Sequence, residues 1–389
     1  MFTKRWITFE SFCLLSFLLG LNYLSIYPKI KPIIPLFQDF YEDKYEYLYP
    51  LLYTILGPIC FKLIWKSFYW CNILAWACVL SYTSLCYLEL DDSYSGPIGR
   101  VLLIFSSSLV LPGAGVLAVK FFDPNEYFFI LSFSSLSNLV GIVFGQVLNY
   151  VLDPEILFLN QVILCIIGPI LFIIGAEKDP TNEEEGFGFV EAIKILFKNQ
   201  DNGILFLTIS AEIGIIFCST TEFFNLYYLL FKGNVKVAYF YLTLFGILSL
   251  IGGFFNLFIL NKIKSFGLMI RLYLGISFLF LFLLNFIFKG PVFYMIMCVL
   301  TGLTTMPSIS FMQIIILGTQ KSVSLPISIN LSYYFSSFFM VLFLLISRTL
   351  YYYDIRSSWG YNIIQLLILT SFLSVYENGI EKKFLGKSN

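Results

Sequence analysis

The feature that most constrains this chain is a series of apolar segments of about 20 residues that recur along nearly its whole length. A helix of that length covers the hydrocarbon core of a bilayer. Charged residues make up only 12% of the chain, against about 25% in soluble globular domains. The sequence therefore predicts an all-α protein that crosses a membrane many times.

The apolar segments predict about twelve spanning helices in two groups of six. The first six are expected at residues 7–27, 45–64, 67–88, 97–119, 127–152 and 155–175, and the second six at residues 203–231, 236–260, 266–288, 291–317, 322–347 and 360–376. This pattern predicts two pseudo-symmetric six-helix bundles, at residues 1–175 and 203–389, around a midplane site. A layout of six plus six helices is typical of major facilitator transporters.

A polar connector at residues 176–202 separates the two predicted bundles. Its second part has apolar residues at helical spacing on one side and charged residues on the other, which predicts a short helix lying on the inner leaflet. The apolar residues are Phe189, Val190, Ile193, Leu196 and Phe197, and the charged ones are Glu191, Lys194 and Lys198.

The distribution of basic residues predicts the orientation. An even number of spans places both termini on one side, and most of the 24 Lys and Arg residues then lie on that side. Cytoplasmic loops carry the excess of basic residues in membrane proteins, so we expect both termini in the cytoplasm. The formal net charge is zero, which gives no indication of a nucleic-acid partner.

The residue types also limit the chemistry. The chain has no histidine, the commonest metal ligand and the usual pH switch near neutrality. The eight cysteines occur singly in apolar segments with no C-x-x-C motif, so no zinc site or redox dithiol is indicated. There is no G-x-S-x-G or P-loop motif. We expect no cofactor and no enzymatic activity, although a membrane enzyme with carboxylates clustered at one membrane face stays an alternative.

One side of the predicted fifth span carries small and amide side chains at a spacing of three or four. These residues are Ser135, Asn138, Gly141, Gly145 and Asn149. An amide facing lipid is costly, so this stripe should face protein or a water-filled cavity. The Gly141/Gly145 pair favours close approach of another helix. The stripe is therefore either a tight helix–helix seam or part of a solute pathway.

Two carboxyl groups lie within the predicted seventh span. At 1.5 Å per residue, Glu212 lies roughly 13 Å from Gly203, close to the middle of the bilayer, and Glu222 lies near the outer end. A carboxyl group at that depth can attract a cationic solute or carry a proton, or it can be a protonated structural residue. In the first span, Tyr23 precedes Pro28 and can offer a π face to a cation.

Polar residues gather in some spans and avoid others. The first, fifth, seventh, eighth, tenth and eleventh spans carry most of them, including Asn330 in the eleventh. The third, sixth, ninth and twelfth spans have few polar residues and are called plain below. In a two-bundle transporter the inner helices line the cavity and the plain helices face lipid. This division favours a transporter.

The region between the fourth and fifth spans resembles the transporters related to the feline leukaemia virus subgroup C receptor, a branch of the major facilitator superfamily. That branch has Trp-Phe after the fourth span, a turn with Glu, and a helix with Asn-x-x-Gly-x-x-x-Gly. The matching residues are Phe121, Phe122, Glu126, Asn138, Gly141 and Gly145. Leu139 stands where the branch has Gln, and residues 61–66 lack the superfamily's Asp-Arg-Gly cluster.

The resemblance implies uptake of choline or ethanolamine, with some members of the branch linked to haem or other organic solutes. It also implies that the cation is held by an aromatic residue of the first span and another of the seventh. The corresponding positions are Tyr23 and Phe217. We therefore expect a monomeric carrier of a small organic solute, working by alternating access, with a cavity lined by Tyr23, Asn138, Gln146, Phe217, Glu222 and Asn330. The two aromatics would offer π faces, Glu222 a counter-charge and the amides hydrogen bonds. The alternatives are an amino-acid or nucleoside transporter of the same fold, and a non-transporting receptor or scaffold.

Overall fold

The structure is a computed structural model that describes residues 4–25, 35–88, 95–123, 126–176, 189–198, 200–230, 235–260 and 325–351, together with scattered positions from 272 to 304 and at 367 and 370. These residues form helices and short turns, and none of them lies in a strand. The predicted ninth, tenth and twelfth spans lie almost entirely outside the described residues. The all-helical expectation is confirmed for the part of the chain that the structure describes.

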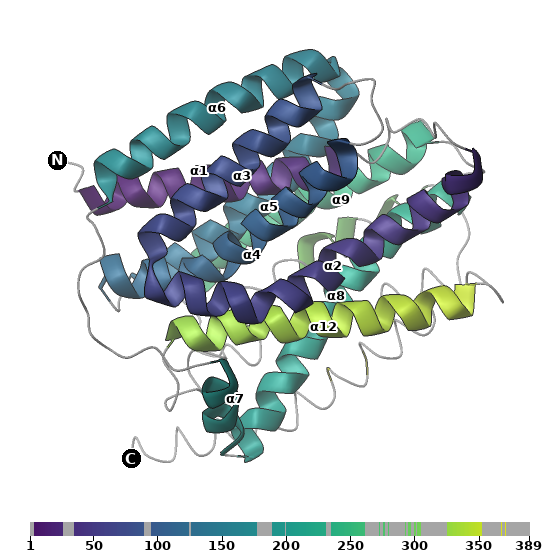
Figure 1. The fold of residues 1–389 in the computed structure, drawn as a ribbon. Coiled ribbons are helices and arrows are strands. Elements are labelled where there is room, and N and C mark those ends of the chain that lie inside the picture. Colours follow the sequence, from purple (N-terminus) through teal and green to yellow (C-terminus); the bar gives the residue numbers. More distant parts are fainter. Residues whose placement is uncertain are drawn as a thin grey trace. The chain divides into compact units, whose positions relative to one another are not determined.

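The chain divides into two compact units. Residues 1–191 and 325–330 form the first unit, and residues 192–324 and 331–389 form the second. The change at residue 191 falls inside the predicted connector, while the domain bounds themselves stay a prediction. The helices, drawn in Figure 1, are α1 Lys4–Ser25, α2 Pro35–Lys66, α3 Phe68–Leu88, α4 Ser95–Phe121, α5 Tyr127–Val151, α6 Pro154–Gly175, α7 Phe189–Lys198, α8 Gln200–Leu230, α9 Val235–Leu260 and α12 Leu325–Tyr351.

Helix α2 begins ten residues before the predicted second span, at Pro35 rather than at Tyr45. Proline is favoured in the first turn of a helix, where its missing N–H is not needed. The added part contains charged residues, which are compatible with a helix but not with the apolar core of a bilayer. The sequence pattern marks only the apolar part of a helix, so the predicted second span lies within α2 and leaves out its polar beginning.

The first unit consists of two groups of three helices, α1–α3 and α4–α6, which pack against each other. Helix α1 packs against α5 and α6, and α4 packs against α2 and α3; α3 and α6 are also in contact. The first helix of each group therefore lies against the second and third helices of the other group. This is the pattern expected of two three-helix repeats within one half of a transporter.

Helices α1 and α5 approach each other at three glycines. A Cβ atom on Gly141 or Gly145 would meet the backbone oxygen of Phe17 or Leu21, and a Cβ atom on Gly20 would meet the carbonyl oxygen of Asn138. Glycine is therefore required on both helices, because any side chain would push the two backbones apart. The small residues of the predicted stripe thus fix the closest helix pair of the first unit.

Helix α6 joins α1 and α3 by small residues and faces outward with large ones. The Ser11 hydroxyl donates to the carbonyl oxygen of Gly168 at 2.8 Å, and a Cβ atom on Gly168 would collide with the ring of Trp76. The opposite side of α6 exposes an apolar row that includes Ile156, Leu159, Ile163, Ile166, Ile170 and Ile173. Such a row is expected on a helix that faces lipid, as predicted for the plain sixth span.

We expect Gly168→Ala to lower the melting temperature, because the added methyl group presses on the Trp76 ring, and overpacking costs about 1–3 kcal/mol. The atoms in its way belong to the six-membered ring of the indole. Adding Trp76→Phe, which removes part of that ring system, should recover some of the loss. Thermal unfolding of both single variants and the double variant checks this, and purely additive losses would contradict the assigned contact.

Many hydroxyl and amide groups of the spans are satisfied within their own helix. Thr54, Asn72, Ser107, Ser134 and Thr208 each donate to the carbonyl oxygen four residues earlier, at 2.7–2.9 Å. This bond lets a polar side chain remain in an apolar environment without an external partner. A polar residue within a span is therefore weaker evidence for a solute pathway than its type suggests.

Helix α7 forms where the sequence predicts a short helix in the connector. Ala192 and Leu196 are buried, whereas Val190 and Phe197 are exposed beside the charged residues. The Phe189 ring packs edge-on against Phe61 of α2, with centroids 5.7 Å apart. Within the predicted apolar face, Leu196 is therefore buried, whereas Val190 and Phe197 face outward. Its place on the inner leaflet stays a prediction.

Length and composition identify three helices that could each cross a membrane among the described residues. These are residues Ile98–Phe121, Ile156–Gly175 and Ile327–Ile346, with a fourth if the bent pair Phe189–Lys198 and Gly203–Cys218 counts as one span. Pro50–Ile64, Phe129–Gly145 and Thr243–Phe255 are shorter apolar helices among the described residues.

Candidate solute site

The stripe on α5 forms a polar seam with α1. Asn138 donates its side-chain N–H to the carbonyl oxygen of Ser16 at 2.9 Å, and the Ser16 hydroxyl donates to the carbonyl oxygen of Ser134 at 3.1 Å. Together with the glycine contacts, these bonds confirm the helix–helix seam at Asn138, Gly141 and Gly145. As a solute ligand, Asn138 stays a prediction, and it is the only predicted amide ligand for which the structure describes an inter-helix bond.

The carboxyl group of Glu212 is buried within α8, with a relative exposure of 0%. It lies twelve residues into the helix, roughly 18 Å from its start. Its neighbours Thr208 and Ser210 are also buried, and Gly214 lies against the backbone of α12, where an added Cβ atom would come within 2.6 Å of the Ser336 oxygen. An ionised carboxylate in such a place needs a cation or hydrogen-bond donors to offset its lost hydration.

The other predicted lining residues are placed to different extents. Phe217 is half-buried on α8, and Asn330 is buried on α12 between the buried residues Ser328 and Ser332. Tyr23, Gln146 and Glu222 have helical backbones in α1, α5 and α8, and their side chains lie outside the description. Four of the six belong to the first unit and two, Phe217 and Glu222, to the second. As a set of solute ligands these residues stay a prediction.

Next to Tyr23, the side chain of Asn22 is buried in α1, and its N–H donates to the carbonyl oxygen of Leu18 at 2.8 Å. The sequence predicts that Asn22 can bond to backbone loosened by Pro28, which lies outside the described residues. The bond to Leu18 is an ordinary bond to the preceding turn of the helix, and the role of Asn22 near Pro28 stays a prediction.

Comparison with known proteins places the chain in a family. The sequence profile of the Major Facilitator Superfamily matches residues 47–325. The chain belongs to the major facilitator superfamily. The exchange of partners between α1–α3 and α4–α6 is therefore the inner repeat of a major facilitator bundle, and the prediction of that fold is confirmed.

Two solved structures of major facilitator type show the same fold along almost the entire chain. The fucose:proton symporter of E. coli has 13% identity and a TM-score of 0.67, covering 96% of this chain and 98% of its own. The human organic anion transporter MFSD10 has 12% identity and a TM-score of 0.71, covering 95% of this chain and 99% of its own. No curated protein matches the sequence. At these identities the likeness shows the fold and leaves the solute open.

Among the described residues of this major facilitator protein, no group of three or more His, Cys, Asp or Glu side chains could hold a metal ion. The described cysteines are free thiols, and all but Cys86 are buried. The polar side chains described at the candidate positions are a carboxyl group, amides and hydroxyls.

Proposed function

We propose that this membrane transporter carries a small organic solute, a choline- or ethanolamine-like cation, by alternating access. The observation that supports the proposal is the fully buried side chain of Glu212, which lies in α8 within the region matched by the family. A buried carboxylate favours a cationic solute, because each charge offsets the cost of removing the other from water. Aromatic residues such as Phe217 add a π face.

The proposal includes an orientation and an assembly state. Both termini lie in the cytoplasm and the protein works as a monomer, with Tyr23, Asn138, Gln146, Phe217, Glu222 and Asn330 as lining residues. The basic residues support the orientation. The chain is an integral multi-pass membrane protein, as expected for its family.

A panel of labelled solutes tests the proposal. We expect cells that lack endogenous uptake and express this chain to take up choline or ethanolamine, and amino acids and nucleosides to remain at background. Uptake of an amino acid or a nucleoside instead would favour the second candidate, a carrier of the same fold for those solutes. No uptake of any solute by protein that reaches the membrane would favour a receptor or scaffold.

We expect Glu222→Gln to lower uptake of the cationic solute without lowering expression, because the amide keeps the shape of the side chain and removes its charge. Initial uptake rates and the amount of protein in the membrane are measured together. Glu191→Gln is the matched control, since Glu191 is an exposed carboxyl group on α7. Unchanged uptake by Glu222→Gln would remove this residue from the proposed site.

A further inference from the structure

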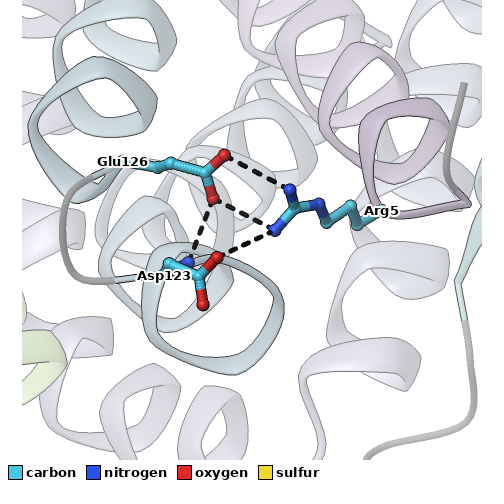
Figure 2. Close-up of polar contacts among 3 residues, drawn as sticks. All are labelled: Arg5, Asp123 and Glu126. Atoms are coloured by element: carbon cyan, nitrogen blue, oxygen red, sulfur yellow. Dashed lines mark hydrogen bonds and ion pairs between the residues drawn. The ribbon is translucent and has the colours of Figure 1, made fainter.

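Three charged residues meet at one end of the first unit, where α1 begins and α4 leads into α5. Arg5 donates from Nη1 and Nη2 to the two carboxylate oxygens of Glu126, at 3.1 and 3.3 Å. Asp123 lies 3.6 Å from the same Nη1 atom. Figure 2 shows the guanidinium group facing the two acidic side chains. This two-pronged geometry is the strongest form of an Arg–carboxylate pair, although the residues are 121 positions apart in sequence.

The setting of this cluster strengthens it relative to a pair on an open surface. The side chains of Arg5 and Glu126 are 33% and 29% exposed, so water screens them only in part. The Arg5 guanidinium carbon also lies 5.4 Å from the centre of the Phe122 ring and 6.0 Å from that of Trp6. Both aromatic faces therefore add a cation–π attraction to the same charge.

The two acidic residues of the cluster are hydrogen-bonded to each other. The backbone N–H of Glu126 donates to the carbonyl oxygen of Asp123 at 2.8 Å, and the backbone N–H of Asp123 donates to the carboxylate of Glu126 at 3.1 Å. Because the turn begins after Phe121, the last residue of α4, and ends at Tyr127, the first residue of α5, one arginine holds the ends of three helices together.

An aromatic layer lies next to the charges. The ring of Phe122 packs edge-on against Trp6 and Phe9 of α1, with centroids 5.2 and 5.8 Å apart, and Phe129 of α5 lies 6.2 Å from each of them. Two turns further along α1, the buried Cys13 faces Ser134 and Ser137 of α5. The α1–α5 interface is therefore filled by packed side chains from the charged cluster to Cys13.

We propose that Arg5, Asp123 and Glu126 form a latch that holds the start of α1 to the α4–α5 turn, so that the ends of these three helices move as one body when the transporter changes conformation. The glycine seam holds α1 and α5 together deeper in the bundle and cannot by itself fix their ends. The latch supplies that second attachment point. This inference does not depend on the identity of the solute.

A double-mutant cycle tests whether the charges act as one device. We expect Arg5→Gln and Glu126→Gln each to lower the melting temperature. The double variant should melt no lower than the less stable single variant, because either change alone already breaks the pair. Lys198→Gln and Glu191→Gln, which remove exposed charges of α7, are the matched controls and should leave the melting temperature unchanged. Losses that add in the double variant, or no loss in either single variant, would overturn the proposal.

The thiol of Cys13 reports whether the latch holds the helices together. It is 8% exposed, and Cys165, which lies on α6 against Thr83 of α3 and is 0% exposed, serves as the internal reference. We expect Arg5→Gln to raise the rate of maleimide modification at Cys13 several-fold, read by mass spectrometry, with Cys165 unchanged, because local opening exposes buried groups. Asp123→Asn, which removes only the 3.6 Å contact to Arg5, should give a smaller rise in this rate. This variant is used in place of Arg5→Gln if Arg5→Gln does not fold. An unchanged Cys13 rate in the folded variant would overturn the latch.

Discussion

Gly141→Ala is expected to abolish most of the folded protein, although it adds a single methyl group. The new Cβ atom would occupy the position of the Phe17 carbonyl oxygen and approach the Leu21 nitrogen. These are backbone atoms of α1, which cannot rotate away as a side chain can. Overpacking of a core commonly costs about 1–3 kcal/mol, and here relief requires the two helices to separate, so we expect a loss of about 3 kcal/mol or more.

The matched control for this prediction is Gly275→Ala, because an added Cβ atom there meets nothing within 4 Å. Alanine is favoured over glycine in a helix by about 1 kcal/mol, so this variant should be as stable as the parent or slightly more so. The amount of monodisperse protein after detergent extraction and heating measures both. If Gly141→Ala survives as well as Gly275→Ala, the close contact of α1 with α5 does not exist.

The sequence could predict that α5 has a face of small and amide side chains, but not which helix packs against that face. A spacing of three or four residues places Asn138, Gly141 and Gly145 on one side of any helix. That spacing does not reveal that α1 is the partner, because partner choice depends on how α1 fits between α5 and α6. The two interpretations of the stripe predicted the same residues. The contacts to Ser16 and Phe17 show the helix–helix seam, and the solute pathway stays a prediction.

Polar residues within the spans carry less functional information than their number suggests. Ser107, Ser134 and Ser336 each bond to their own helix, at 2.9, 2.7 and 2.6 Å. From the sequence alone they resemble residues that line a pathway. The uneven distribution of polar residues among the spans therefore indicated the protein class correctly, while individual hydroxyls gave no guide to a site.

The contacts of the latch also could not be predicted from local sequence patterns. Arg5 is visible in the sequence as a basic residue before the first span, and Glu126 as an acidic residue in a turn. Because 121 residues separate them, only a topology that brings the start of the first span to the fourth-to-fifth turn would pair them. The predicted orientation places both on the cytoplasmic side, which is the one sequence signal that could have suggested the contact.

Glu212 differs from the other carboxyl groups that the structure describes in the spans because it is completely buried. Glu10, by contrast, is exposed on α1. A carboxylate removed from water costs several kcal/mol unless charge or hydrogen bonds compensate it. Under the proposed function, the Glu212 carboxyl group takes part in binding the cation.

We therefore expect Glu212→Gln to lower uptake of the cationic solute by more than about tenfold, since loss of one partner of a buried charge pair costs about 2–5 kcal/mol. The melting temperature should not fall, because the amide keeps the shape of the side chain and needs no counter-charge. Glu10→Gln is the matched control and should leave uptake unchanged. If Glu212→Gln instead transports normally but loses stability, the carboxyl group serves the packing of α8, and the cation must be attracted by another residue.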